Sequence, residues 1–332
     1  GQQLALQAAG VLRTIGEYEE ALKQCDDVLK HSPADEAAGC LKGELLTDLG
    51  RYQEALKVFD GLVAADAKNH RAWALRGRLA ATLGLKDIVK RTSDHFFDLF
   101  NGNAERYYRG EVEDPLELAY VGLGIQDENP KDAFEVGFML AEQLVEKRGL
   151  KEPEVFVWSG RLAQEKYSFD FAGKRFQTAL RMRPKLPDAL TGLAQVVLAV
   201  RHDITRAEPM LKEALEVNPR HAEAHLTLAM IHLQEDNDAE AKKHLDAALA
   251  ANPAHLDALA MLAFYYHDLK LPDREAEVER RVLAVNPRHA DYYCSVGELL
   301  ESKRGFAEAP EYYRKAIALD PAASALEVAY RE

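Results

Sequence analysis

Residues 222–253 read AEAHLTLAMIHLQEDNDAEAKKHLDAALAANP, and the proline that closes this stretch belongs to a regular series. Pro219, Pro253, Pro287 and Pro321 stand 34 residues apart, each after an amphipathic segment. Self-similarity at a fixed period of this size is typical of a solenoid of stacked helical pairs. Because a solenoid offers a long shared groove in place of a single pocket, the period favours binding over catalysis.

Each period divides into two helices. Counted from Ala222, the small residues Ala229 and Ala241 stand at positions 8 and 20, where they allow the helices to approach closely. Larger residues fill the seam between the helices at positions 4, 7, 11 and 24, namely His225, Leu228, His232 and Leu245. Proline at position 32 stops the second helix, because it lacks the N–H donor and clashes with the preceding turn. The unit from Ala290 repeats the pattern with Tyr293, Val296, Gly297, Leu300, Ala309, Tyr313, Ala316 and Pro321.

This pattern resembles the tetratricopeptide repeat. The resemblance implies an all-α fold, a right-handed superhelical solenoid of antiparallel helix pairs. We expect three repeats in residues 1–101, an irregular loop plus a divergent helical pair in 102–152, and five repeats in 153–323. The divergent pair should have helices near residues 115–126 and 130–148, and residues 324–332 should begin a further or capping helix.

The net charge of −13 limits the choice of partners. Residues 1–110 hold 15 Lys and Arg against 16 Asp and Glu, whereas residues 111–332 hold 27 against 39. This acidic excess argues against nucleic acid, which calls for a basic stripe, and permits a basic partner. The alternative is that the acidic residues only keep a long surface soluble. No run of 18 apolar residues occurs, so we expect no membrane span.

The chain carries no recognisable catalytic or cofactor motif. It has no phosphate-binding Gly-x-x-x-x-Gly-Lys-[Ser/Thr] loop, no His-Glu-x-x-His and no Gly-x-Ser-x-Gly. Cys25, Cys40 and Cys294 are too few and too scattered for a disulfide framework or a zinc site. We therefore expect no enzyme and no cofactor.

The histidines follow the repeat. His221, His255 and His289 recur every 34 residues, each two residues after a proline, which is a turn position. His221 and His225 have the four-residue spacing that can chelate a metal, but His225 falls on a seam position. A catalytic zinc also needs a third protein ligand and an ordered outer shell, so we expect no metal site here.

The resemblance places partner contacts on the first helix of each pair, mainly at positions 2, 5, 9, 12 and 13. The predicted partner-binding residues are Thr191, Gln195, Glu223, Leu226, Met230, Asp257, Ala260, Phe264, Asp291 and Glu298. Among them, Leu226, Met230, Ala260 and Phe264 should form an exposed apolar strip with an acidic edge, and such patches mark interaction sites. Two alternatives stay open. Curvature can bury Met230 and Phe264 against neighbouring repeats, and carboxylates in the first turn of a helix favour its dipole without any partner.

A second candidate surface is the surplus segment 101–114, which we expect to be a loop. Tyr107, Tyr108 and Arg109 are of the residue types that dominate binding hot spots. The alternative is that the segment packs on the flank of the solenoid and buries its tyrosines.

The sequence therefore predicts a non-catalytic scaffold that binds a peptide or protein segment in a concave groove. The partner should carry apolar anchors and basic flanks. An alternative function is the substrate-recruiting repeat region of a larger enzyme, such as a bacterial exported peptidase whose catalytic domain is absent from this sequence. Self-association through terminal helix faces is a third hypothesis. The sequence allows a cytoplasmic location or export followed by removal of a leader.

Overall fold

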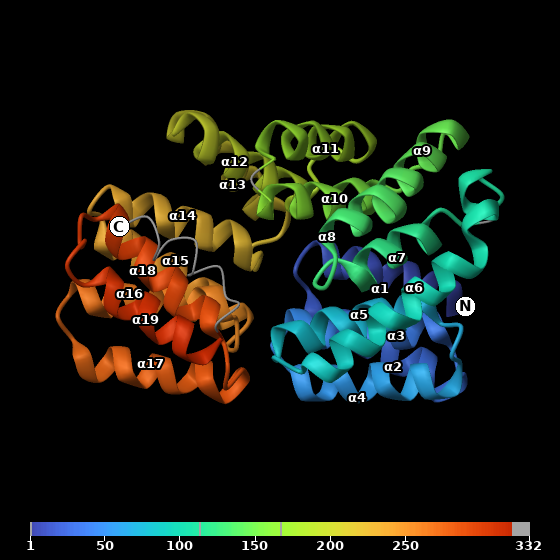
Figure 1. Cartoon of the computed structure of the whole chain (residues 1–332), viewed down its shortest axis with the longest axis horizontal. Helices are drawn as coiled ribbons and strands as arrows, with labels where there is room; N and C mark the ends of the chain where they lie inside the picture. Colours follow the sequence, from blue (N-terminus) through green and yellow to red (C-terminus); the bar gives the residue numbers. More distant parts are fainter. Residues whose placement is uncertain (1, 113, 167, 321–332) are drawn as a thin grey trace. The chain divides into compact units, whose positions relative to one another are not determined.

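The computed structural model describes residues 2–112, 114–166 and 168–320, and the regular structure of these residues is entirely helical (Figure 1). The all-α fold of paired helices predicted from the sequence is thereby confirmed. The chain forms two compact units, Gly1–Pro219 (unit 1) and Arg220–Glu332 (unit 2). None of the described helices is long and apolar enough to cross a membrane. The helix expected at residues 324–332 lies outside the described residues.

Unit 1 begins with five regular helices and one long one. They are α1 (Gln2–Thr14), α2 (Tyr18–His31), α3 (Glu36–Asp48), α4 (Tyr52–Ala65), α5 (His70–Thr82) and α6 (Lys86–Tyr108). It continues with α7 (Leu116–Ile125), α8 (Pro130–Asp132), the π-helical segment η1 (Ala133–Phe138), α9 (Met139–Arg148), α10 (Pro153–Glu165), α11 (Phe169–Met182), α12 (Pro187–Arg201) and α13 (Ile204–Val217). Asn218 Nδ2, directly after α13, donates to Tyr18 Oη at 3.1 Å, so the first and last pairs of this unit meet.

The described residues of unit 2, 220–320, form three helical pairs. They are α14 (Ala222–Gln234) with α15 (Asp238–Ala251), α16 (Leu256–Asp268) with α17 (Pro272–Val285), and α18 (Ala290–Ser302) with α19 (Ala309–Leu319). The first helices of successive pairs pack against each other, since α16 contacts both α14 and α18. The first turns of α14, α16 and α18 therefore lie in a row, and these turns carry acidic residues that the sequence predicted for the edge of the groove.

The backbone repeats with the same period as the sequence. Seven of the turns inside helical pairs contain a residue in the left-handed region, and within two series these residues recur at intervals of 34. They are Gly16, Gly50 and Gly84 in one series and His202, Asp236, Lys270 and Arg304 in the other. A left-handed residue ends the first helix, a role that glycine fills with the least strain.

The small residue at position 8 has the steric role that the sequence indicated. A Cβ atom on Gly43 would lie 2.3 Å from Cε1 of Phe59, and one on Gly297 would lie 2.5 Å from Cε1 of Tyr313. Each aromatic ring thus occupies the space that a larger side chain would need. The helices of a pair are held at close range because one contributes a ring and the other contributes no side chain.

The expectation of an irregular loop at residues 101–114 is wrong for its first half. Helix α6 runs without a break through Gly102 to Tyr108. Phe96, Phe100 and Tyr107 are buried and lie on one face of the helix, so continued burial favours helix over loop. A Cβ on Gly102 would meet nothing within 4 Å, which shows that this glycine marks neither a turn nor a close approach. The chain turns only at Gly110, with φ of 71°.

The divergent pair lies where the sequence placed it. Asp114 Oδ1 accepts a hydrogen bond from the N–H of Leu116 at 2.9 Å at the start of α7, and the partner helix runs from Pro130 to Arg148 through α8, η1 and α9. A Cβ on Gly137 would lie 2.4 Å from the Cα of Gly122, so the two backbones touch. One hydrophobic core, from Ala74 to Val196, runs through this region and joins it to both neighbours.

The repeat from Leu256 departs from the pattern at Glu275 and Glu279, and the structure shows why both carboxylates are tolerated. Glu275 accepts a hydrogen bond from Tyr312, and Glu279 accepts one from Tyr293. Tyrosine–carboxylate pairs therefore replace the missing Ala and aromatic contacts. Val278 and Val282 of the same helix are buried, as the sequence predicted for its rotated face.

Candidate functional site

The apolar strip predicted for the groove is not exposed. Leu226, Ala260 and Phe264 are 5%, 2% and 1% exposed, and only Met230 is partly accessible. The three buried residues belong to the hydrophobic core of unit 2, which also contains Tyr292 of α18. The prediction of an exposed strip is therefore wrong, and the alternative, burial against neighbouring repeats, is correct for Phe264.

Two further predicted groove residues, Thr191 and Gln195, lie on α12 in unit 1. Thr191 is buried, and Gln195 is partly buried with its Oε1 accepting a hydrogen bond from Gln164 Nε2 at 3.0 Å. They line the same helix face one turn apart. The hydrogen bond between Gln164 and Gln195 joins α10 to α12, so Gln195 has a role in packing the repeats together.

The acidic residues of the predicted groove are the ones that reach solvent. Glu223, Asp257 and Asp291 stand in the first turns of α14, α16 and α18, and Glu298 follows two turns after Asp291. We call these four residues the acidic row. Asp257, Asp291 and Glu298 are exposed, and within the described part of the chain none of these three forms an ion pair, whereas Glu223 partners His255 at 3.3 Å.

The members of the acidic row affect one another. Partial burial, and the nearby charges of Glu223 and Asp291, raise the pKa of Asp257, although His255 and His289 act in the opposite direction. The pKa of Glu298 is also raised, by burial and by Glu301 and Asp291. In both cases neighbouring carboxylates contribute to the shift, and a nearby cation would act in the opposite direction.

The histidines between the carboxylates are turn residues, as predicted. His221, His255 and His289 are the N-cap residues of α14, α16 and α18. Nδ1 of His221 accepts a hydrogen bond from the N–H of Ala224 at 3.2 Å. The side chains of His255 and His289 make no such capping hydrogen bond, so the three histidines share a turn position but not a capping contact.

The second candidate surface is only partly accessible. Tyr107 is 1% exposed and its hydroxyl donates to Glu117 Oε1 at 2.7 Å, so it is a packing residue and not a contact for a partner. Tyr108 is 63% exposed and its ring stands edge-on to Phe100. Arg109 is exposed and lies 3.6 Å from carboxylates of both Glu105 and Glu111. Tyr108 and Arg109 are therefore accessible to a partner, whereas Tyr107 is not.

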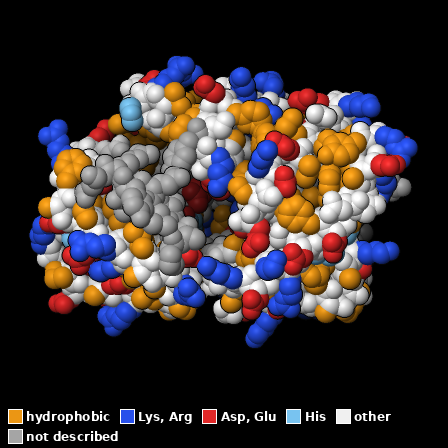
Figure 2. Space-filling model, in the orientation of Figure 1, with side chains coloured by type: hydrophobic (Ala, Val, Ile, Leu, Met, Phe, Trp, Pro, Cys, Tyr) orange, Lys and Arg blue, Asp and Glu red, His pale blue; other side chains and the backbone are white. Residues whose placement is uncertain are grey.

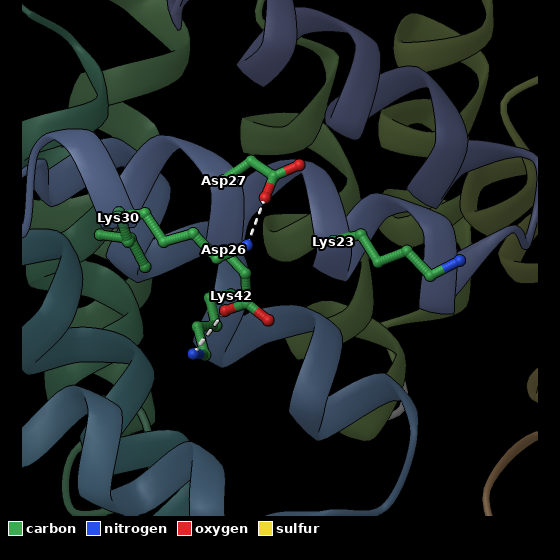
Figure 3. A pocket seen from close by; sticks show the side chains of 6 residues that line it. Lys23, Asp26, Asp27, Lys30 and Lys42 are labelled. Carbon is green, nitrogen blue, oxygen red and sulfur yellow. Dashed lines mark hydrogen bonds and ion pairs between the residues drawn. The ribbon is translucent and has the colours of Figure 1, made fainter.

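A surface hollow of 560 Å³ lies between α2 and α3, and two of its lysines pair with aspartates that also line it (Figure 3). Lys30 Nζ is 2.6 Å from Asp27 and Lys42 Nζ is 2.6 Å from Asp26. On the face drawn in Figure 2, cationic and anionic side chains are interspersed and apolar side chains form small groups.

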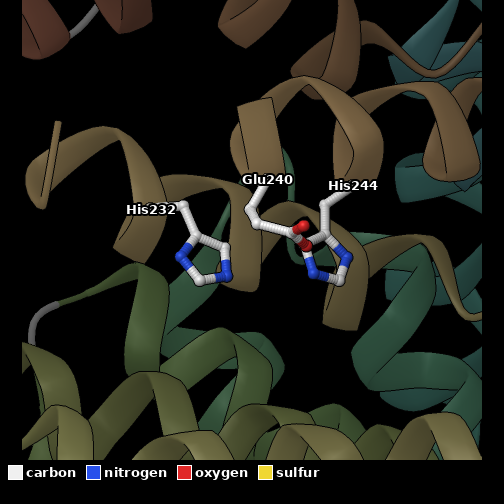
Figure 4. Close-up of side chains that lie close together, drawn as sticks. All are labelled: His232, Glu240 and His244. Carbon is white, nitrogen blue, oxygen red and sulfur yellow. The ribbon is translucent and has the colours of Figure 1, made fainter. Parts of the chain in front are cut away.

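A group of histidines in the seam between α14 and α15 was not predicted. Nδ1 of His225 lies 2.9 Å from Nδ1 of His244, and the ring of His232 stacks on that of His244 with centroids 5.6 Å apart. Glu240, in the first turn of α15, completes the group (Figure 4). Burial, followed by the nearby His225 and His232, lowers the pKa of His244 to about 4.

Comparison with known families decides the affiliation. A family model described as tetratricopeptide repeat matches residues 15–79 and 201–263, and a second model of the same description matches residues 280–324. The chain belongs to the tetratricopeptide repeat family. No curated protein matches it.

Several solved tetratricopeptide repeat structures are similar. TTC0263, a thermophilic TPR protein of Thermus thermophilus, is 19% identical over 56% of this chain and 98% of its own, with a TM-score of 0.47. MamA is 23% identical over 51% of this chain and 92% of its own, with a TM-score of 0.35. YrrB, described as a TPR protein with an unusual peptide-binding site, is 18% identical over 57% and 97%, with a TM-score of 0.34.

Alignment of the repeats with one another could have revealed the histidine group from the sequence. The sequence places His225 and His232 in the seam but does not show their proximity to His244. Positions 4, 11 and 23 of the next repeat hold Leu259, Tyr266 and Val278, and those of the following repeat hold Tyr293, Leu300 and Tyr312. Three histidines at these positions in one repeat are an anomaly that the alignment of the repeats makes visible.

Proposed function

We propose that this chain is a non-catalytic protein-interaction scaffold and that unit 2 receives a basic segment of its partner along the acidic row. Membership of the tetratricopeptide repeat family supports the scaffold role, since solenoids commonly use an extended surface built from successive repeats to bind proteins. The groove remains the proposed place of binding. Its apolar floor is largely buried, so the proposal rests on charge.

The observation that carries this proposal is the set of exposed carboxylates without an ion-pair partner among the described residues. Asp257, Asp291 and Glu298 come from two adjacent helices, and neighbouring carboxylates contribute to the raised pKa of Asp257 and of Glu298. Lysine or arginine side chains of a bound segment would supply the missing positive charge. Met230, partly accessible on α14, offers an adaptable apolar contact beside the row.

The test uses two fluorescent peptides of equal length, one rich in lysine and leucine and one with every lysine replaced by glutamine. The lysine peptide should bind the wild-type chain in a fluorescence anisotropy titration, and the glutamine peptide should not. The triple variant Asp257→Asn, Asp291→Asn, Glu298→Gln should bind the lysine peptide at least tenfold more weakly.

The matched control removes the same charge elsewhere. Glu20, Asp27 and Glu54 are carboxylates of unit 1 that pair with Lys23, Lys30 and Arg51. The variant Glu20→Gln, Asp27→Asn, Glu54→Gln should keep wild-type affinity. Equal weakening in both triple variants would show that binding reflects net charge only, and would refute a role for the acidic row.

A further inference from the structure

The seam of the α14–α15 pair differs in chemistry from the seams of the other two pairs in unit 2. The corresponding seam positions in those pairs carry apolar or aromatic residues, whereas here they carry His225, His232 and His244. Imidazoles are polar, and a buried polar group needs a partner. Nδ1 of His232 is buried without a hydrogen-bond partner, and a carboxylate oxygen of Glu235 is 3.5 Å away.

The geometry directs one nitrogen of each of two rings to a common point. Nδ1 of His244 faces His225 and Nδ1 of His232 lies on the side of Glu235, which leaves the Nε2 atoms of both rings available. One ligand atom from each of His232, Glu240 and His244 lies within 4.8 Å of the other two. Figure 4 shows the two imidazoles and the carboxylate turned toward one another, with one ligand from α14 and two from α15.

Two imidazole nitrogens and one carboxylate oxygen are ligands that zinc prefers. Tetrahedral zinc holds such atoms at about 2.0–2.2 Å, which separates neighbouring ligands by about 3.4 Å. The atoms here lie within 4.8 Å of one another, and rotation of Glu240, which is only partly buried at the start of α15, can adjust its distances to the two imidazoles.

We propose that His232, Glu240 and His244 bind a Zn²⁺ ion that joins α14 to α15. His225 is a positioning residue, because its hydrogen bond to Nδ1 of His244 fixes which nitrogen of that ring faces the metal. The fourth coordination position is open to water. The site is independent of the acidic row and makes no use of the proposed partner.

The experiment measures zinc retained by the full chain after treatment with chelator and dialysis against ZnCl₂. The wild type should retain one equivalent at this site, and zinc should raise the melting temperature of the chain. Replacement of the zinc bound to the wild-type chain by Co²⁺ should give visible absorption bands with the intensity that is typical of tetrahedral Co²⁺. The double variant His232→Tyr, His244→Val takes its new residues from the next repeat, so it should fold and should lose this equivalent, the thermal shift and the cobalt bands.

The control is the other histidine–carboxylate group of unit 2. His255 lies near Glu223 and Asp257, and His255→Gln should leave the zinc, the thermal shift and the cobalt spectrum unchanged. Glu240→Gln, which disturbs the seam least, should weaken zinc binding at least tenfold. The proposal is overturned if the wild type retains no zinc, or if the double variant or Glu240→Gln binds zinc like the wild type.

Discussion

Phe264 occupies a position that the repeat register assigns to the groove, yet its side chain is 1% exposed. Phe264→Ala should therefore lower the free energy of unfolding by about 3 kcal/mol, as truncation of a buried phenylalanine does. Phe306, which is 63% exposed, provides the control, and Phe306→Ala should change stability by less than about 0.5 kcal/mol. Urea denaturation followed by circular dichroism measures both. Similar small effects for the two variants would mean that Phe264 is not core.

His244 gives a prediction for pH. Its pKa in the folded chain is about 4, below the usual value of about 6.5 in an unfolded chain. Between these values the unfolded state binds more protons, so the contribution of His244 to stability is lost as the pH falls from about 7 to about 4. The groups facing it are His225, His232, Lys243 and Glu240. In the presence of chelator, the free energy of unfolding of His244→Val should depend less on pH than that of the wild type over this window. An equal pH dependence in the two proteins would contradict the lowered pKa of His244.

At the residue scale, the sequence predicted steric roles better than exposure. Gly43 and Gly297 were recognisable as contact points because a repeat pattern states which position faces its partner helix. The burial of Phe264 was not recognisable from the sequence. A ring at a groove position is buried or exposed depending on residues one repeat away, such as Tyr292. The proximity of His232 and His244 likewise depends on the pairing of two helices, which a linear spacing does not show.

The turns within the pairs give a prediction at the element scale. Gly50 has φ of 72°, whereas Gly61 stands inside α4, where an added Cβ would meet nothing within 4 Å. Gly50→Ala should destabilise by about 1 kcal/mol because alanine is strained in the left-handed region. Gly61→Ala should stabilise by about 0.5–1 kcal/mol through helix propensity. Thermal unfolding compares the two, and the same sign for both substitutions would contradict the turn geometry.

Helix α6 is an example of a helix whose end could not be predicted from the sequence. Gly102 and Gly110 indicated a loop, but the apolar spacing of Phe96, Phe100 and Tyr107 continues past Gly102. Tertiary burial outweighs the weak local preference of a glycine, which costs only about 1 kcal/mol within a helix. By contrast, α7 and the helix from Pro130 were predictable, because a cap and a proline mark both starts.

For the whole molecule, the structure moves the expected point of separation. The irregular sequence of residues 101–152 predicts the weak point of the array there, but the core of unit 1 runs through them and the units divide at Pro219 and Arg220. The repeat boundaries at 1–101, 102–152 and 153–323 stay a prediction. The period predicted the pairs but not this division, which depends on how tightly successive pairs pack.

The tryptophans allow the two units to be followed separately. Trp73 and Trp158, the only tryptophans in the chain, both lie in unit 1, whereas helices fill both units. Because solenoid units interact mainly with their neighbours, unfolding should depart from a single two-state transition. Urea curves from tryptophan fluorescence and from circular dichroism should therefore differ in midpoint. Superimposable curves would show that the chain unfolds as one cooperative block.

The central claim is that the acidic row recognises a basic segment, and the salt dependence of the association rate constant tests it most directly. Stopped-flow binding of the lysine-rich peptide should slow as salt is raised from about 20 to about 300 mM, because the Debye length falls to less than about 10 Å. In the Asp257→Asn, Asp291→Asn, Glu298→Gln variant the rate constant should be lower and nearly independent of salt. The account would be contradicted if the association rate constant of the wild type did not change with salt, or if the variant kept the salt dependence of the wild type.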